Sequence, residues 1–292
     1  MSVYIWLHKW AIQVRRHFVA VDIKLLEQLY FTFDEDVPYK LEDGSEITIT
    51  PIMLRQSETF LVSADLLKID KNSMGSVDII QMSYLEFLYQ HIFSKDQTAL
   101  YKFNIILTFC LKWPHWRIIR DNDTHKIGIL NDETKAIISA QDFDDIRRII
   151  MFQNILNYND DYISPDLKKM MAEVDSVKNG NIQPPSLERK ISIITAHSGL
   201  SKKDQLQMTM RAHQSLFEEV CGEVDFTTTR AIAMFAGKAD EIGHWIFPKK
   251  KGKYDGYMVS MKNYSQSFGG KQSIVAQTEG NLSDIIANKI HK

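Results

Sequence analysis

Acidic residues near the middle of the chain are the first candidates for chemistry. Asp142, Asp144 and Asp145 follow Glu133 at short spacing, and clustered carboxylates can bind a divalent cation or move protons, as nuclease sites do. A nuclease site of that kind also needs a lysine at one-residue spacing on a strand, whereas Lys135, at that spacing from Glu133, lies in the turn between the expected strands. The three aspartates are explained more simply as the first turn of a helix, where negative charge is favoured.

A second acidic segment resembles a metal-binding loop. Asp121-Asn122-Asp123 matches the start of a calcium loop, and Asp132 falls at its twelfth position. Lys126 occupies the sixth position, where that loop turns at glycine, and the twelfth normally carries the longer glutamate. The segment therefore predicts a turn with solvated acids rather than a cation site.

The histidines and the known catalytic motifs give no site either. The nine histidines do not recur at metal-ligand spacing; His115 and His125 would need a third ligand, and His91 lies on an apolar helical face. The chain has no GxGxxG, GxxxxGK[ST], GxSxG or HExxH segment. The sequence therefore predicts no catalytic residue, cofactor or metal, and a protein that is not an enzyme. An enzyme of unrecognised type would need a concave pocket lined by two acids, or by a histidine with an acid.

One basic stretch carries a sharper signal. Between Pro248 and the end of the chain, eight lysines oppose three acidic residues, whereas the whole chain has a formal charge of −2. Basic charge with interleaved aromatic rings can hold phosphates and stack on bases, and a charged tail can equally dock on an acidic protein surface. The candidate interaction residues are Lys249, Lys250, Lys251, Lys253, Tyr254 and Tyr257.

Composition sets the class of protein. The chain has 292 residues, of which 44% are hydrophobic and 25% charged, as in a globular protein with a core of its own. Cys110 and Cys221 have no CxxC partner, so we expect buried free thiols in a reducing compartment. No apolar run approaches the roughly 18 residues that span a bilayer, and we expect no membrane partner.

The candidate residues Asp142, Asp144 and Asp145 lie in the segment Ile137 to Asn157, which must position them. Ser139 can cap a helix there, and Phe143, Ile146 and Ile150 recur at three- and four-residue spacing. The segments before this helix indicate mixed strand and helix, whereas those after it indicate helix alone. The helix is therefore expected to join two kinds of module.

The N-terminal module is predicted to be α+β. A hairpin is expected over 30–52, with its turn at residues 42–44, and it should place Ile47 and Ile49 on one face. Helices are expected over 53–70 and 77–92, and a third apolar helix or a long buried segment is expected over 98–112. Short strands over 116–120, 126–130 and 136–138 then form an antiparallel meander.

The C-terminal module is predicted to be a helical bundle. Ser186 should cap a helix over 187–197, and Ser201 should begin a long helix that buries residues up to Val220. Further helices are expected over 227–236 and 240–247. The expected domains are an N-terminal arm (1–28), the α+β module (29–174), a linker (175–186), the helical module (187–247) and a basic, largely extended tail (248–292).

Four segments of the chain resemble a family of phage proteins. They are YFTFDEDVPYKLEDGSEITITPI, LLKIDKNSM, IIQMSYLEFLY and ISAQDFDDIRRIIMFQN. In this order they are similar to virion and tail-assembly proteins, including tail-assembly chaperones, of phages that infect Gram-positive bacteria. The resemblance lies within residues 30–245 and is carried by core and turn residues, so no functional residue is transferred.

The resemblance implies a non-enzymatic protein that acts through protein-protein contacts. Its partners would be phage tail or other virion proteins, with self-association left open, and it would act in the host cytoplasm during assembly or within the virion. Assembly chaperone and permanent virion component are not distinguished, because both need only a complementary surface. The alternative is a nucleic-acid-binding protein that uses the basic tail.

Overall fold

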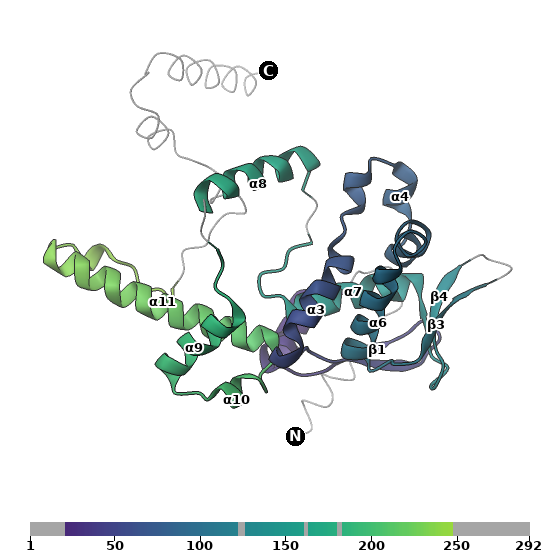
Figure 1. Ribbon diagram of the computed structural model, residues 1–292, viewed down its shortest axis with the longest axis horizontal. Helices are drawn as coiled ribbons and strands as arrows, with labels where there is room; N and C mark the ends of the chain where they lie inside the picture. Colours follow the sequence, from purple (N-terminus) through teal and green to yellow (C-terminus); the bar gives the residue numbers. More distant parts are fainter. Residues whose placement is uncertain (1–20, 122–125, 161–162, 180–182, 248–292) are drawn as a thin grey trace, which may run out of the picture. The chain divides into compact units, whose positions relative to one another are not determined.

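The computed structural model describes residues 21–121, 126–160, 163–179 and 183–247 (Figure 1). These residues belong to two compact units. The first unit contains the described residues up to Pro165 together with 183–242, and the second contains 166–179 and 243–247. The elements are mostly helices, with two small antiparallel sheets in the first unit. The expected α+β class is therefore confirmed.

The first sheet is the expected hairpin. β1 (Val37–Lys40) and β2 (Glu46–Ile49) pair antiparallel, with Tyr39 opposite Ile47. The chain reverses through Gly44, whose φ of 87° lies in the region that glycine adopts without strain. Alternate side chains of both strands are buried, including Ile47 and Ile49. The prediction that these two isoleucines share one face is confirmed.

The second sheet is the expected meander, in the order β3 (Trp116–Arg120), β4 (Ile127–Asn131) and β5 (Ile137–Ser139). Ile129 lies between Ile118 and Ile138 in the register, and this row of isoleucines faces the core. On the opposite face, a Cβ added at Gly128 would stand 3.2 Å from Ile137 Cγ2. Glycine therefore allows the neighbouring strand to pack closely there.

β5 continues directly into α7 (Ala140–Asn154). Ser139 Oγ accepts the Asp142 N–H at 3.0 Å, and the Asp142 carboxylate accepts the Ser139 N–H at 3.3 Å, which completes a capping box. Phe143, Ile146 and Ile150 are fully buried along one face. The predicted central helix is confirmed, although it ends at Asn154.

The helical segments that precede the meander are more broken than expected. The predicted helix over 77–92 is wrong, because Met82 is extended and Ser83 begins a new helix through a capping box with Glu86. The predicted helix over 98–112 is confirmed as α6. The elements are α2 (Ile23–Leu29), η1 (Phe31–Phe33), η2 (Leu54–Gln56), α3 (Ser57–Ala64), η3 (Asp65–Lys68), η4 (Lys71–Met74), α4 (Val77–Gln81), α5 (Tyr84–Phe87), η5 (Leu88–Phe93) and α6 (Gln97–Leu111).

The later helices also differ from the prediction. Ser201 caps only a short helix, and Thr209 caps the long one. The expected break before Thr227 is wrong, because one helix continues through it, and η6 stands where a helix over 240–247 was expected. The elements are α8 (Pro165–Asn179) in the second unit, and α9 (Leu187–Ser198), α10 (Lys202–Gln205), α11 (Met210–Phe235) and η6 (Ala239–Glu241) in the first.

Backbone hydrogen bonds to the N-terminal half explain the break before α11. The Leu54 N–H donates to the Met208 carbonyl at 2.8 Å, and the Met210 N–H donates to the Ile52 carbonyl at 2.7 Å. These bonds pair residues 208–210 with 52–54 in an extended bridge, which a continuous helix could not form because its backbone groups would already be bonded within the helix.

The structure also bears on the expected segment boundaries. α8 continues to Asn179, so the first residues of the expected linker are helical. Residues 23–28 of the expected arm belong to α2, whose Ile23 and Leu26 pack against the core. Contacts place residues 183–242 in the same compact unit as the described residues up to Pro165. Residues 1–20 and the expected tail, 248–292, lie outside the described residues.

We expect Asp142→Ala to lower the free energy of unfolding by about 3 kcal/mol, because the Glu42 and Ser139 N–H groups would lose their buried acceptor. Asp145→Ala is the matched control, since Asp145 is only half-buried and the one hydrogen bond resolved for it comes from the Tyr39 hydroxyl. The control should lose less than about 1 kcal/mol. Urea unfolding followed by circular dichroism measures both, and equal losses would contradict the assignment.

Candidate functional site

The three aspartates at the start of α7 are used as hydrogen-bond acceptors inside the first unit. Asp142 accepts the Tyr39 hydroxyl and the Glu42 N–H, both at 3.2 Å. Asp144 accepts the Tyr84 N–H at 2.8 Å, and Asp145 accepts the Tyr39 hydroxyl at 3.2 Å. The sequence explained these residues as helix-start charge; the structure adds that they join α7 to β1 and α5.

Burial changes the electrostatics of this cluster. It raises the pKa of Asp142 and of Asp144 above the ordinary aspartate value, and hydrogen bonds to the ionised carboxylates oppose the rise. Arg147 lies 4.1 Å from the centre of the Tyr84 ring, and its Nε donates to the Leu67 carbonyl at 2.7 Å. Burial raises the pKa of Tyr84 to about 12. These groups form contacts within the first unit, and the arrangement stabilises the fold.

A second buried polar cluster connects α9, α10 and α11. Gln205 Nε2 donates to the Thr195 hydroxyl at 2.9 Å and to the Ile191 carbonyl at 3.2 Å. Gln205 Oε1 lies 3.2 Å from His213 Nε2. Burial lowers the pKa of His213, and the positive charge of Lys190 lowers it further. A neutral His213 that donates to Gln205 therefore suits this environment, and both side chains serve packing.

The remaining candidates for chemistry do not form a metal or thiol site. The parts of the chain that the structure describes contain no group of three or more His, Cys, Asp or Glu placed to hold a metal ion. His115 Nε2 lies 3.9 Å from Glu133 Oε1 in an exposed pair. Cys110 is buried, and burial raises the pKa of its thiol to about 12. The expectation that Cys221 is buried is wrong, because it lies exposed on α11.

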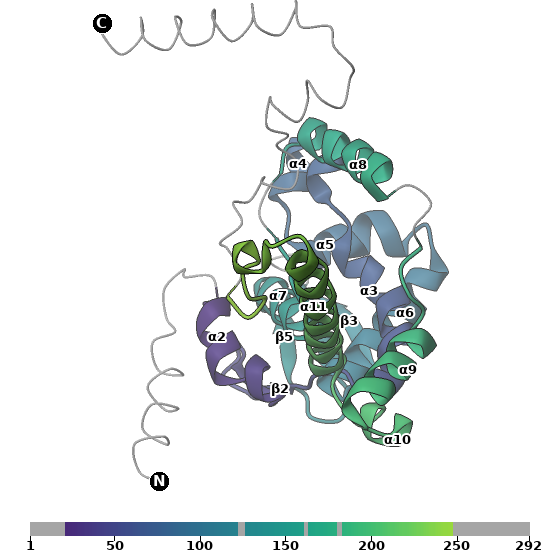
Figure 2. The same ribbon diagram turned by 90° about the vertical axis from the view of Figure 1, so that its left-hand side faces the viewer.

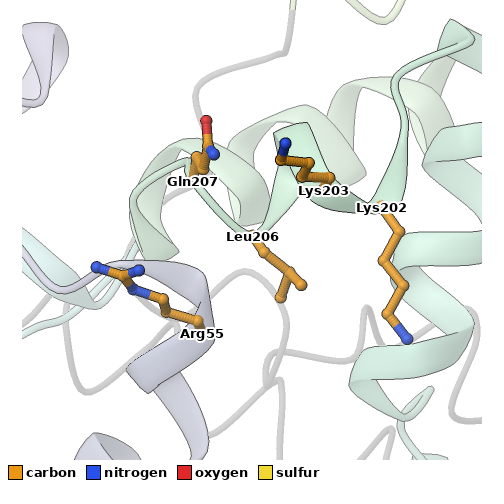
Figure 3. Close-up of a pocket in the computed structure, with 5 residues that line it drawn as sticks. All are labelled: Arg55, Lys202, Lys203, Leu206 and Gln207. Carbon is orange, nitrogen blue, oxygen red and sulfur yellow. The ribbon is translucent and has the colours of Figure 1, made fainter.

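A hollow in the surface lies between η2 and α10 (Figure 3). It has a volume of about 480 Å³ and is lined by Arg55, Lys202, Lys203, Leu206 and Gln207. In Figure 3 the charged ends of Arg55 and Lys202 point away from each other, and Leu206 lies between them. The lining residues include three cationic side chains and no acid or histidine. In Figure 3 the three cationic ends point in different directions, so they do not form a convergent anion site.

The outer half of α11, residues 221–235, presents the most unusual surface among the described residues. Met210, His213 and Val220 are buried along one face of the first half of the helix. Val224 and Phe235 continue that face at helical spacing, yet they are 41% and 96% exposed. Ile232 and Met234, at the margins of this face, are each 66% exposed. Figure 1 shows α11 extending beyond α9, which contacts the first half of the helix, and Figure 2 shows the same helix from the side of its far end.

The sequence did not predict this surface. The sequence predicted that one helix ends after Val220 and that another begins at Thr227. This predicted break divided the apolar face that is continuous along α11. The signal that could have found it is the spacing of Val220, Val224, Ala231 and Phe235. The six interaction residues predicted in the basic stretch, 249–257, lie outside the described residues, as do Asp123 and His125.

Comparisons with known proteins identify no relative. No family model, no curated protein and no solved structure matches the chain. Within the described ranges, no helix has both the length and the apolar content needed to cross a bilayer.

We expect the stability of the protein to fall as the pH is lowered through His213's titration range. Because the folded-state pKa of His213 lies below its unfolded value of about 6.5, the unfolded chain takes up a proton that the folded chain does not. The stabilising contribution of the neutral His213 is therefore fully present above about pH 6.5, and it decreases as the pH falls below that value.

The measurement is urea unfolding at about pH 7.5 and about pH 5.5. His213→Gln, which keeps a hydrogen-bonding group beside Gln205, should show a smaller decrease than the wild type. The matched control is His197→Gln, at an exposed position on α9, and it should keep the wild-type decrease. An unchanged pH dependence in the His213 variant would contradict the role assigned to its burial.

Proposed function

We propose that the protein acts by binding other proteins through the outer half of α11. The observation that supports this proposal is the exposed apolar face formed by Val224, Ile232, Met234 and Phe235. Apolar side chains gathered on one helical face lose contact with water when a partner covers them, which favours association. The buried first half of the same face has this role within the chain, where it packs on α9.

We propose further that the partners are phage tail or other virion proteins. The four segments that resemble tail-assembly and virion proteins support this partner class, and an exposed helix face suits assembly through complementary surfaces. The protein would act without catalysis, in the host cytoplasm during assembly or as part of the virion. The basic stretch at residues 249–257 supports nucleic acid as the alternative partner.

We expect a variant with Val224→Ser, Ile232→Ser and Phe235→Ser to lose its protein partners. The test is a pull-down of the full chain from cells that express the neighbouring genes, with mass spectrometry of the retained proteins and absorbance at 260 nm for nucleic acid. Serine removes the apolar area and remains compatible with a helix, so circular dichroism should show a folded protein.

The matched control replaces exposed apolar residues elsewhere, with Val62→Ser on α3 and Tyr101→Ser on α6, which are 60% and 69% exposed. It should retain the same partners as the wild type. Equal recovery of tail or virion subunits by the α11 variant and the control would exclude α11 as the binding surface. Recovery of nucleic acid alone, with dependence on Lys249 to Lys253, would favour the alternative function.

A further inference from the structure

The outer half of α11 carries a seven-residue pattern in both its apolar and its charged positions. Val224, Thr227, Ala231 and Met234 recur at three- and four-residue intervals, which is the spacing of a seam between two helices. Glu223 and Arg230 lie seven residues apart, directly beside Val224 and Ala231. They therefore occupy the same flank of this seam, one seven-residue repeat apart.

Both flanking charges are available for a partner. Glu223 and Arg230 are exposed, and neither forms an ion pair with another residue in the described parts of the chain. The Arg230 guanidinium lies 5.7 Å from the centre of the Phe226 ring, a contact that orients it without neutralising it. Because the two side chains are two turns apart on one helix, they lie too far apart to pair with each other.

The pattern is complementary to itself in one orientation. Two such helices can run antiparallel, with Val224 of one opposite Thr227 of the other. The flank that carries Glu223 and Arg230 on one helix then faces the same flank of the other helix. Glu223 then lies beside Arg230 of the second copy, and the two-fold axis generates the same pair again. A parallel pair would place Glu223 near Thr228 and Arg230 near Phe235, so no opposite charges would meet.

We propose that the outer half of α11 binds a second copy of this chain, antiparallel and across a two-fold axis. The proposal rests on the proposed function, because the seam shares Val224 and Met234 with the apolar face proposed there as a binding surface, and it names the occupant of that surface. Val224 and Thr227 form the central layers, and the two Glu223–Arg230 pairs set the orientation. Thr227 and Ala231 are small, which lets the helices approach closely, and the short seam limits the strength of the dimer.

Charge reversal in the purified full chain tests the proposal. The experiment measures the dimer dissociation constant by sedimentation equilibrium for the wild type, for Glu223→Arg, for Arg230→Glu and for the double variant. Each single reversal turns two attractive pairs into two repulsive ones, so each should weaken the dimer about tenfold. The double reversal restores both pairs, and its dissociation constant should return close to the wild-type value.

Three results would overturn the proposal. They are a wild type that stays monomeric at every concentration, a dimer that neither single reversal weakens, and a double variant as weak as the singles. Circular dichroism of all four proteins shows whether a loss comes from unfolding instead. If the wild type is monomeric but still captures tail subunits through α11, the proposed function stands and only the dimer is overturned. If the protein forms a dimer that responds to charge reversal but captures no tail subunit, only the proposed tail partner is overturned.

Discussion

The fold depends on buried polar bonds that hold the hairpin along α7. At one end of the helix, Asp142 accepts the Tyr39 hydroxyl and the Glu42 N–H. At the other end, Asn154 Oδ1 accepts the Ile52 N–H at 2.7 Å, and Gln153 Nε2 donates to the Ile49 carbonyl at 3.3 Å. Because an unbonded polar group in this interior costs free energy, these bonds favour one register of the hairpin on α7, although the buried Gln153 Oε1 has no hydrogen-bond partner among the described residues. The isoleucines of α7 then pack between these two anchor points.

The same constraint determines where α11 begins. Ile52 and Leu54, which follow the hairpin, form backbone hydrogen bonds with residues 208–210 before α11. The Thr209 side-chain oxygen caps α11 by accepting the Ala212 N–H, and the same hydroxyl donates to Asp34 Oδ1 at 2.5 Å. Arg211 Nη1 donates to the Phe152 carbonyl of α7 at 2.7 Å, and Nη2 pairs with Glu27. The first turns of α11 are thus fixed to both the hairpin and α7. Its remaining turns follow from helix geometry, which carries residues 221–235 beyond α9.

Local features of this fold could be predicted from the sequence, and features that depend on distant partners could not. The Ser139 cap, the hairpin and the meander each depend on residues close together in the chain. The bridge before α11 instead needs bonds to residues about 150 positions away, at Ile52 and Leu54. The continuity of α11 was missed because Gly222 and the threonines 227–229 have low helix propensity. The three aspartates were correctly placed on a helix, but their partners Tyr39 and Tyr84 lie in other elements.

The low helix propensity of the outer half of α11 affects how it can bind. Gly222 and the threonines 227–229 make an isolated helix over residues 221–235 unstable in water. This segment is helical because the anchored first half supplies the helix nucleus, and propagation from an existing turn costs less than nucleation. A partner that covers the apolar face binds the helical form in preference to the unwound one. Binding and helix stability are therefore linked, so any protein that occupies this face also stabilises the segment that presents it.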